Sequence, residues 1–587
     1  MTLLAGAYSR NPGDVIPPSL AMSLEGALSR HPVESIERFR DDRCLLVKAD
    51  IGAFGAPARI VDASGASFMT GEPLLATPAR ARRPRDADLM ALHSALTRDD
   101  ESLLRSARGV FSLAHYDVVA GRLILVTDKL GIRPLYVAVG ERHVVFASAL
   151  RILEQLGEVS KSMDLRGVTE LAAFGYPLAD RTAYESIRLL MPGEIMEMRD
   201  AEVRLRRYWR WDDIAPSDLS LDELASRSYA CFTETVALRN GADRTTAAFL
   251  SGGLDSRAIV GALRDRDIAV RTFNFALLGT QDQVFGADFA RRVGVTHVEA
   301  PMKPAHPAWS LMMSQALAEF PEPDDRRAER PRVVWSGDGG SVAIGHVYLT
   351  PALVAQARSG DVPALVESMN RSWGGEVPRR LMRPAWADQL AGVTRRGLTE
   401  ELDCITAGDR GRALHLLLMY NDQRRHLTEH FEGIDLHRLE FELPFFDSDF
   451  VASVLEVPVD ACLGHAFYMR WMRCFPEVLM SVPWQAYPGH EPCPLPAPPA
   501  LRYQWEHALS RPIREALKKK LVTEARELLH ARDFPDAMMS RHFLRLAALL
   551  YRLDLRDLGH IIRTATTYHR YWSRSGGRVG SVRASRE

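Results

Sequence analysis

The stretch that decides the fold is Ser251-Gly252-Gly253-Leu254-Asp255-Ser256, a short turn between two apolar segments. Residues 246–250 have the apolar composition of a buried strand, and residues 257–264 have the pattern of a helix. Two glycines let a backbone approach a ligand closely, and the first turn of a helix offers N–H groups to an anion. The stretch therefore predicts a phosphate-binding turn in which Asp255 holds Mg²⁺ against a pyrophosphate group.

The segments that follow alternate between strand and helix. Residues 270–276 and 296–299 are typical of strands, and residues 285–293 form a helical pattern that Gly294 ends. Strands alternating with helices of this length indicate βαβ units, so we expect an α/β fold with a parallel sheet.

The rest of the chain divides on either side of this α/β segment. Strand patterns at 110–117, 122–127 and 143–147 indicate a sheet-rich first domain, and an amphipathic helix is expected over 221–238. The sequence beyond residue 350 is mostly helical until a proline-rich stretch at 492–499. We predict three domains, at 1–210, 211–490 and 491–587.

Composition excludes several classes of protein. The 587 residues are 46% hydrophobic with a net charge of −1, although 501–587 carries 18 basic against 9 acidic residues. The balanced total argues against whole-chain affinity for nucleic acid or membrane. Six widely spaced cysteines form no zinc pattern, and we find no signal sequence or membrane-length apolar run, so we expect a cytoplasmic protein.

The glycine-rich turn has no Lys after its second glycine and is therefore not a Walker A motif. It resembles the loop of ATP pyrophosphatases, which split ATP into AMP and pyrophosphate. Together with other segments, it resembles the asparagine synthetase family over about residues 1–490. The other matching segments are 126–136, 145–148, Pro192-Gly193, Tyr208-Trp209, 336–340 and 443–447.

This resemblance implies an N-terminal αββα domain of the Ntn-hydrolase type, an ATP-pyrophosphatase domain, and the cofactors ATP and Mg²⁺. It assigns Asp255 and Asp338 to catalysis and to the metal. It assigns nucleotide binding to Leu250, Ser251, Gly252, Gly253, Leu254, Asp255, Ser256, Phe275 and Gly337.

The N-terminal part departs from the family at its nucleophile. Glutamine-dependent members carry Cys after the initiator Met, where this chain has Thr2, and their Asn-Gly-Glu reads Thr70-Gly71-Glu72 here. A threonine exposed by removal of Met could act as an N-terminal nucleophile. The alternative is a relic domain that is kept for packing.

The second part departs at two further positions. Ser341 replaces an Asp that helps to hold Mg²⁺ in the family, so Asp338 could bind the metal or position the nucleophile. The family's downstream catalytic Lys is missing, because residues 304–517 contain no lysine, and Trp484 stands near its position.

These losses favour an enzyme whose nucleophile is a substrate amine, as in lasso peptide cyclases. Such enzymes resemble asparagine synthetase and join an Asp or Glu side chain of a leader-free precursor peptide to the peptide's own N-terminal amine. The resemblance implies a leader peptidase and a leader-binding protein as partners. The alternative enzyme is a small-molecule amide synthetase of the asparagine or β-lactam type, and a non-catalytic scaffold is a third hypothesis.

One competing motif is His426-Leu427-Thr428-Glu429-His430, which fits the H-x-x-E-H zinc pattern if both histidines share a helical face. A solvated or substrate-facing helix explains it better, since two arginines precede it. In the same way, Lys518 to Lys520 indicate an exposed helical face that could guide an acidic partner.

Overall fold

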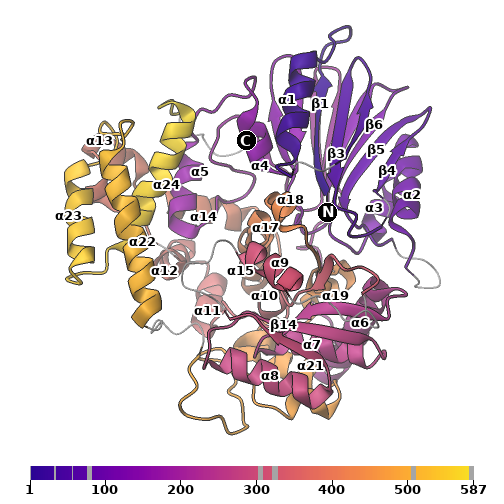
Figure 1. Ribbon diagram of the computed structural model, residues 1–587, viewed down its shortest axis with the longest axis vertical. Helices are drawn as coiled ribbons and strands as arrows, with labels where there is room; N and C mark the ends of the chain where they lie inside the picture. The colour runs from indigo at the N-terminus through magenta and orange to yellow at the C-terminus, as the bar shows by residue number, and fades with distance from the viewer. Residues whose placement is uncertain are drawn as a thin grey trace.

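The computed structural model describes residues 2–31, 35–55, 57–75, 82–301, 309–319, 328–373, 375–503 and 511–580. Within them the chain forms three sheets, with two antiparallel sheets at one end and a parallel sheet at the other. Helices of the C-terminal half lie beside and between them (Figure 1). The predicted α/β fold class is confirmed.

The N-terminal part is a four-layer αββα sandwich. One six-stranded sheet has the order β10-β8-β9-β1-β3-β2 and the other has the order β12-β11-β7-β6-β5-β4. All pairings in both sheets are antiparallel. The strands are β1 (Thr2–Ser9), β2 (Ile36–Arg40), β3 (Cys44–Asp50), β4 (Arg59–Val61), β5 (Gly65–Gly71), β6 (Phe111–Asp117), β7 (Arg122–Thr127), β8 (Tyr136–Val139), β9 (His143–Ala147), β10 (Ile187–Leu189), β11 (Glu194–Arg199) and β12 (Glu202–Arg207).

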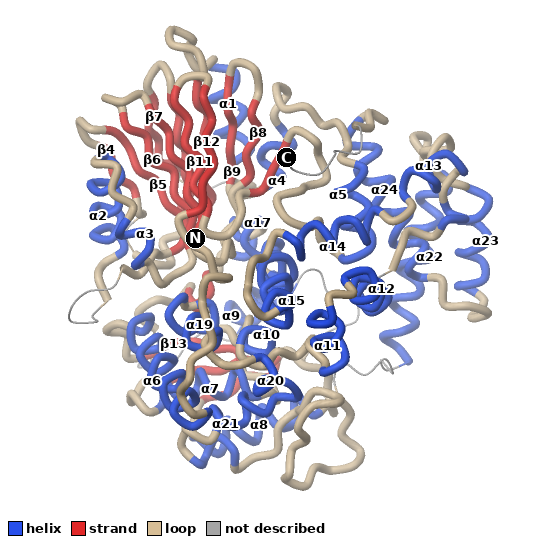
Figure 2. The backbone as a smooth tube through the Cα atoms, turned by 180° about the vertical axis from the view of Figure 1, so that it is seen from behind, coloured by secondary structure: helices blue, strands red, loops and turns tan. Residues whose placement is uncertain are grey.

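Helices cover both outer faces of this sandwich. Helices α1 (Pro18–Leu28) and α4 (Leu150–Gln155) pack on the first sheet, and α2 (Arg85–Thr97) packs on the second beside α3 (Ser102–Ser106). The back view shows the strands of the two sheets stacked (Figure 2). Strands β7 and β9 have the bounds that the sequence predicts.

The second part is built on a five-stranded parallel sheet of order β15-β14-β13-β16-β17. The strands are β13 (Thr245–Phe249), β14 (Ala269–Asn274), β15 (Thr296–Glu299), β16 (Val333–Trp335) and β17 (Glu440–Glu442). The helices between and beside them are α6 (Leu221–Asn240), α7 (Leu254–Arg264), α8 (Gln281–Val293), α9 (Trp309–Glu319) and α10 (Gly340–Ala343).

The predicted elements of this sheet differ little from the structure. Gly294 caps α8 in the left-handed conformation, and β15 has its predicted bounds. Helix α7 begins three residues earlier than predicted, at Leu254, because extended Gly253 is its N-cap. Asp255 therefore lies on the first turn of a helix and not in a free loop.

The chain beyond residue 350 is mostly helical, as predicted, and no helix spans 481–503. Its elements include α11 (Pro351–Ser359), α12 (Val362–Trp373), α13 (Pro384–Leu390), α14 (Val393–Asp403), α15 (Arg410–Leu418), α16 (Arg424–His426), α17 (Thr428–Glu432), α18 (Ile434–His437), α19 (Ser448–Leu455), α20 (Val459–Cys462), α21 (Ala466–Met472), α22 (Arg511–His530), α23 (Arg541–Arg552) and α24 (Gly559–Ser575).

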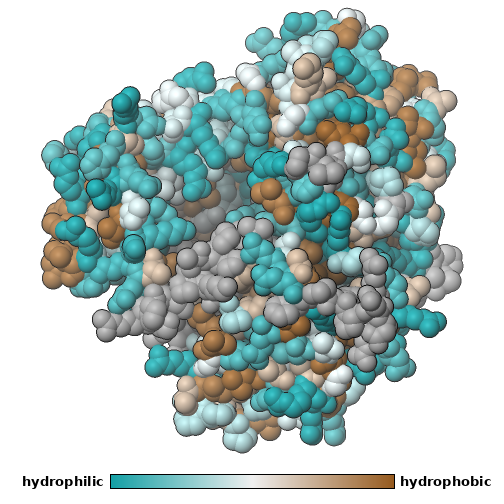
Figure 3. All heavy atoms as spheres, in the orientation of Figure 1, coloured by the Kyte–Doolittle hydropathy of each residue, from teal (hydrophilic) through white to brown (hydrophobic). Residues whose placement is uncertain are grey.

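The last three helices pack on one another, and α24 also packs on α5 (Leu165–Phe174). They form the edge of the molecule that is yellow in Figure 1. Leu546, Leu549 and Leu553 of this region are exposed, and Figure 3 shows apolar side chains along the same edge.

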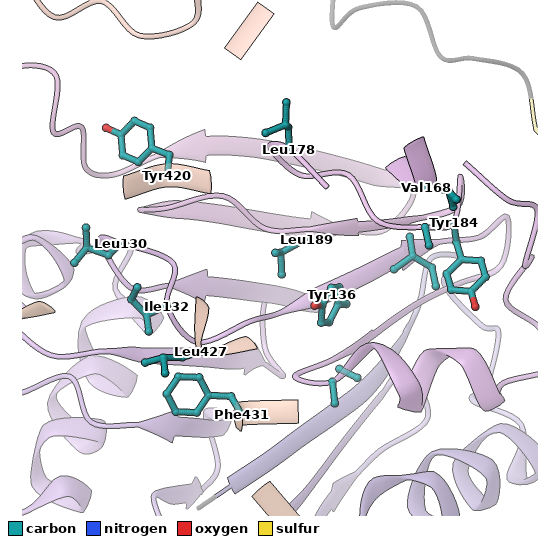
Figure 4. Close-up of a cluster of buried hydrophobic side chains, with 14 of the residues drawn as sticks. Leu130, Ile132, Tyr136, Val168, Leu178, Tyr184, Leu189, Tyr420, Leu427 and Phe431 are labelled. Carbon is teal, nitrogen blue, oxygen red and sulfur yellow. The ribbon is translucent and has the colours of Figure 1, made fainter. Parts of the chain in front are cut away.

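The region from α16 to α18 is held firmly by the N-terminal part. Leu427 and Phe431 are buried beside Ile132, as the close-up shows (Figure 4). The Tyr136 hydroxyl donates a 2.6 Å hydrogen bond to Glu432. Because buried apolar contacts combine with hydrogen bonds here, the N-terminal part fixes the position of these short helices.

Buried ion pairs join the same two parts. Arg133 contacts Glu440 at 2.6 Å, and both side chains are at most 2% exposed. Asp447 accepts hydrogen bonds from Arg108 of the N-terminal part and from Arg239 of α6. Removing one member of such a pair leaves a buried charge without compensation, so these contacts fix the arrangement of the parts.

No single helix within the described residues is both long and apolar enough to cross a membrane. A sharply bent pair, Ser448–Leu455 with Val459–Met472, meets the criteria of length and composition.

Candidate active site

The glycine-rich turn lies between β13 and α7 and is held by its own hydrogen bonds. The Ser256 hydroxyl lies 3.0 Å from the Ser251 hydroxyl and accepts a bond from the Ser251 N–H, and Gly253 donates to Ser251. The Gly252 N–H donates to Asp282 at 2.8 Å. A Cβ atom on Gly252 would lie 2.6 Å from Asp282 Cα, so this position requires glycine.

Asp255 projects from the first turn of α7 and accepts two hydroxyl hydrogen bonds. Tyr468 of α21 donates at 2.6 Å, and Ser341 of α10 donates at 2.7 Å. The pKa of the Asp255 carboxyl is raised, chiefly by burial and also by the charge of Asp338. The hydrogen bonds from the two hydroxyls oppose this shift. The Asp255 side chain is half-buried and bound on two sides.

Asp338 lies in the turn after β16 and pairs with His426 at the end of α16. His426 Nε2 is 3.1 Å from Asp338 Oδ1, and the Ser336 hydroxyl donates to the other oxygen. Burial alone would raise the pKa of Asp338, but the hydrogen bond and charge of His426 outweigh it, so that the pKa is lowered. The same contact raises the pKa of His426.

The two aspartates open into one cavity of about 870 Å³. Every residue that the sequence assigns to the site lines this cavity except Gly252, whose N–H is bound to Asp282. Five carboxylates belong to the described lining, and no Lys or Arg does. The five are Asp255, Asp282, Asp338, Glu429 and Glu491.

An apolar wall faces the glycine-rich turn. Phe249 lies 5.7 Å from Phe275 and 5.6 Å from Phe441 between ring centroids. Met312 of α9 and Leu517 of α22 also line the cavity. The wall therefore combines the parallel sheet with the C-terminal helices, and a flat heterocycle fits such aromatic surfaces.

The segment with Trp484 is tied to the glycine-rich turn. Gly252 accepts a 2.9 Å hydrogen bond from the Gln485 N–H, and Arg257 of α7 donates to Val482 at 2.8 Å. Trp484 lines the cavity. The side chain near the position of the missing lysine is therefore a buried aromatic ring without a charge.

The zinc reading of 426–430 does not fit the geometry. The helix breaks at Leu427, so His426 ends α16 while His430 belongs to α17. No group of three or more metal-binding His, Cys, Asp or Glu side chains occurs in the described residues. His426, Glu429 and His430 all line the cavity, which agrees with the hypothesis of a substrate-facing segment.

The surroundings of Thr2 in the N-terminal part consist of paired charges. Thr2 pairs with Asp50 in the ladder of β1 and β3. The Asp50 carboxylate contacts Lys48 at 3.2 Å and Arg85 at 3.1 Å. Glu72 of the Thr70-Gly71-Glu72 stretch accepts two hydrogen bonds from Arg82. Charged side chains of this region thus neutralise one another.

Several residues of the cavity were missed in the sequence. Tyr468 and Asp282 have no motif around them, and only the fold brings them to the glycine-rich turn. Ser341 was recognised as a replaced aspartate, yet its hydroxyl donates directly to Asp255. His426 was recognised within a zinc pattern. Its contact with Asp338, 88 residues away in the chain, is formed only by the fold.

Comparison with protein families matches two segments of the chain. Residues 81–209 match a glutamine amidotransferase domain, and residues 229–321 match an asparagine synthase domain. By this domain composition, the chain is similar to the asparagine synthetase family. The second match includes the glycine-rich turn and ends before Asp338, whose place in the site rests on the geometry.

Several curated relatives are named asparagine synthetases. A protein of Mycobacterium tuberculosis, provisionally named a glutamine-hydrolyzing asparagine synthetase, is 26% identical over 375 residues. The alignment covers 61% of this chain and 54% of that protein, so the chain matches about half of its relative's length. Asparagine synthetase 3 of Bacillus subtilis is 23% identical over 176 residues, covering 30% of this chain and 28% of that protein.

Among solved structures, glutamine phosphoribosylpyrophosphate amidotransferase of B. subtilis is 11% identical. The alignment covers 64% of this chain and 79% of that one, with a TM-score of 0.25.

Proposed function

We propose that the protein is an ATP-dependent, amide-forming ligase that closes a macrolactam ring on a ribosomal peptide, as lasso peptide cyclases do. It would activate an Asp or Glu side chain of a leader-free precursor peptide as an adenylate and join it to the N-terminal amine. AMP and pyrophosphate would be released. The observation that carries the proposal is the juxtaposition of Asp255, Asp338 and His426 in one cavity.

The glycine-rich turn and the first turn of α7 suit the phosphates of ATP, and the aromatic wall suits its adenine ring. The described lining contains no Lys or Arg to balance the phosphate charge. Asp255 and Asp338 are close enough to influence each other's charge, and Mg²⁺ commonly binds one or two carboxylates together with substrate phosphates. These residues fit Mg²⁺, which would stabilise the negative charge that develops on pyrophosphate.

The pair of Asp338 and His426 suits the second half-reaction, in which the amine attacks the adenylate. When the neutral ring carries its proton on Nε2, Asp338 accepts that proton's hydrogen bond and Nδ1 presents a lone pair. The described residues give Nδ1 no other partner. We therefore assign His426 the role of accepting a proton from the attacking amine, with Asp338 orienting the ring and stabilising its charged form.

In this step the amine nitrogen forms a bond to the carbonyl carbon of the adenylate. The bond from that carbon to the phosphate oxygen breaks, and AMP leaves with the electron pair. One proton of the ammonium form passes to His426 before attack, and a second leaves to solvent afterwards. A positioned general base commonly accelerates such a step by about 10²- to 10⁴-fold.

A substrate amine as nucleophile agrees with the N-terminal part. The carboxylates near Thr2 are paired with Lys48, Arg82 and Arg85, and the thiol of glutamine-dependent relatives is missing. An oriented amine of the same peptide can reach an effective concentration of about 10⁵ M or more, beyond that of free ammonia. A leader peptidase and a leader-binding protein would supply the substrate.

The test is to incubate the protein with ATP, Mg²⁺ and leader-free candidate peptides, following nucleotide products and peptide mass. AMP, pyrophosphate and a peptide lighter by one water are expected. ADP and orthophosphate would contradict the nucleotide chemistry. Conversion of aspartate to asparagine with ammonium, without reaction of any peptide, would favour a small-molecule synthetase instead.

A further inference from the structure

One of the five carboxylates that line the cavity differs from the other four. Asp255 and Asp338 accept hydroxyl hydrogen bonds, and Asp282 accepts the Gly252 N–H. Glu491 lies 3.6 Å from Arg473. The side chain of Glu429 is exposed and has neither a hydrogen bond nor an ion pair within the described residues.

The backbone around Glu429 is well anchored. The next residue, His430, is buried, and its ring stacks on Phe441 with centroids 3.8 Å apart and an angle of 12° between the planes. On the other side, Glu432 accepts the hydrogen bond of Tyr136. Glu429 is thus a free carboxylate on a fixed segment, and it opens into the same cavity as His426.

A carboxylate in this position suits a cation. It is not needed to hold the helix, since a charge in the first turn of so short a helix stabilises it by at most about 1 kcal/mol. The described lining supplies no Lys or Arg to pair with it. A charged group on the substrate is the partner that this arrangement lacks.

We propose that Glu429 binds the N-terminal ammonium group of the peptide substrate and delivers it to His426. This inference rests on the proposed function, whose acceptor is that same amine. Glu429 binds the charged form of this amine within the cavity that His426 also lines. Glu429 is therefore a specificity-determining residue for a free, positively charged peptide N-terminus.

The experiment compares two forms of one leader-free precursor peptide, with a free and with an acetylated N-terminus. Pyrophosphate–ATP exchange reports carboxylate activation and does not require the amine to react, so it gives a KM for both forms. For the unaltered protein we expect the free form to have a KM about tenfold lower, which corresponds to about 1.4 kcal/mol. Glu429→Gln should bring the two KM values together by raising the KM of the free form to that of the acetylated form.

Glu477→Gln is the matched control, because Glu477 is exposed in the first turn of another short helix and does not line the cavity. It should keep the tenfold ratio. Equal KM values in the unaltered protein, or a ratio that survives Glu429→Gln, would overturn the role of Glu429. Exchange with neither peptide form would instead overturn the proposed function, and with it this inference.

Discussion

Two of the clusters of buried and half-buried carboxylates among the described residues differ in their partners. In the N-terminal part, Asp50 is paired with Lys48 and Arg85, and Glu72 is paired with Arg82. In the cavity of the second part, Asp255 is held by the hydroxyls of Tyr468 and Ser341, and Asp338 by a hydroxyl and a histidine.

This difference indicates that the N-terminal cluster stabilises the fold, whereas the cluster in the cavity is available for a ligand or a reaction. Carboxylates neutralised by Lys and Arg have little capacity left for a ligand, and removing one member leaves buried charge unbalanced. Carboxylates oriented by neutral hydroxyls keep their negative charge available to a cation or a proton. We therefore expect substitutions in the cavity to abolish turnover, and those in the N-terminal cluster to lower stability.

The largest effect is expected for Asp255→Asn. This change keeps the shape of the side chain and an oxygen acceptor for Tyr468 or Ser341, while removing the negative charge that suits Mg²⁺. Formation of AMP and pyrophosphate should fall by about 10³-fold or more. Circular dichroism and the thermal midpoint should stay close to those of the unaltered protein, and near-normal turnover would move the metal site elsewhere.

The next effect is expected for His426→Ala, and it should divide the two half-reactions. Ring closure should slow by about 10²-fold or more because the attacking amine loses its proton acceptor. Pyrophosphate–ATP exchange should fall much less, since His426 acts on activation of the carboxylate only through the charge of Asp338. Equal losses in both assays would contradict this role and would indicate that His426 acts through the shape of the ATP site.

Much of this cavity could be predicted from the sequence. The strand, glycine-rich turn and helix around Asp255 follow from local composition, and Asp338 was placed by the family resemblance. Contacts from distant segments could not be predicted in this way. Tyr468 lies 213 residues from Asp255 with no pattern around it, and only packing of α21 brings its hydroxyl there.

The fold of the N-terminal part was also predictable in outline, because short apolar strands with turns between them indicate antiparallel sheets. The sequence showed that the nucleophile was replaced, but not what surrounds it. Lys48 lies on the same strand as Asp50, but Arg85 comes from the start of α2, 35 residues from Asp50, and only the fold brings it there. Predicted domain boundaries at 210 and 490 stay predictions.

A third experiment tests the structural cluster with Asp50→Ala. Lys48 is fully buried and Arg85 nearly so, and both would lose their shared counter-charge. The free energy of unfolding should fall by about 3 kcal/mol or more, while turnover per folded molecule is retained. Urea denaturation measures the change, with exposed Asp218→Ala as the control. Loss of turnover without loss of stability would mean that this cluster takes part in the reaction.

A smaller effect concerns the pH dependence of stability. Burial first, and then the charge of Arg85, lower the pKa of Lys48 to about 7, although Asp50 and Glu37 oppose the shift. The unfolded chain keeps this proton up to a pH near 10.5, so stability should rise with pH between about 7 and 10. Lys48→Met should remove about 1 kcal/mol per pH unit of this rise. Urea midpoints of both proteins at pH 7, 8 and 9 measure this difference. The same dependence of stability on pH in the unaltered protein and in Lys48→Met would contradict it.

The smallest effect is expected for Thr2→Ala, which should change nothing in catalysis. Thr2 takes the place of the thiol nucleophile of glutamine-dependent relatives, and the backbone of Thr2 pairs with Asp50 inside the charged cluster. Glu72, the acidic residue of the Thr70-Gly71-Glu72 stretch, is already bound to Arg82 and is not free to hold a glutamine ammonium group. We therefore expect no glutamate release from glutamine, either before or after the substitution, and the same rate of ring closure. Glutamate release that Thr2→Ala abolishes would show instead that a hydroxyl nucleophile works in this domain, and it would make ammonia a candidate acceptor in the second cavity.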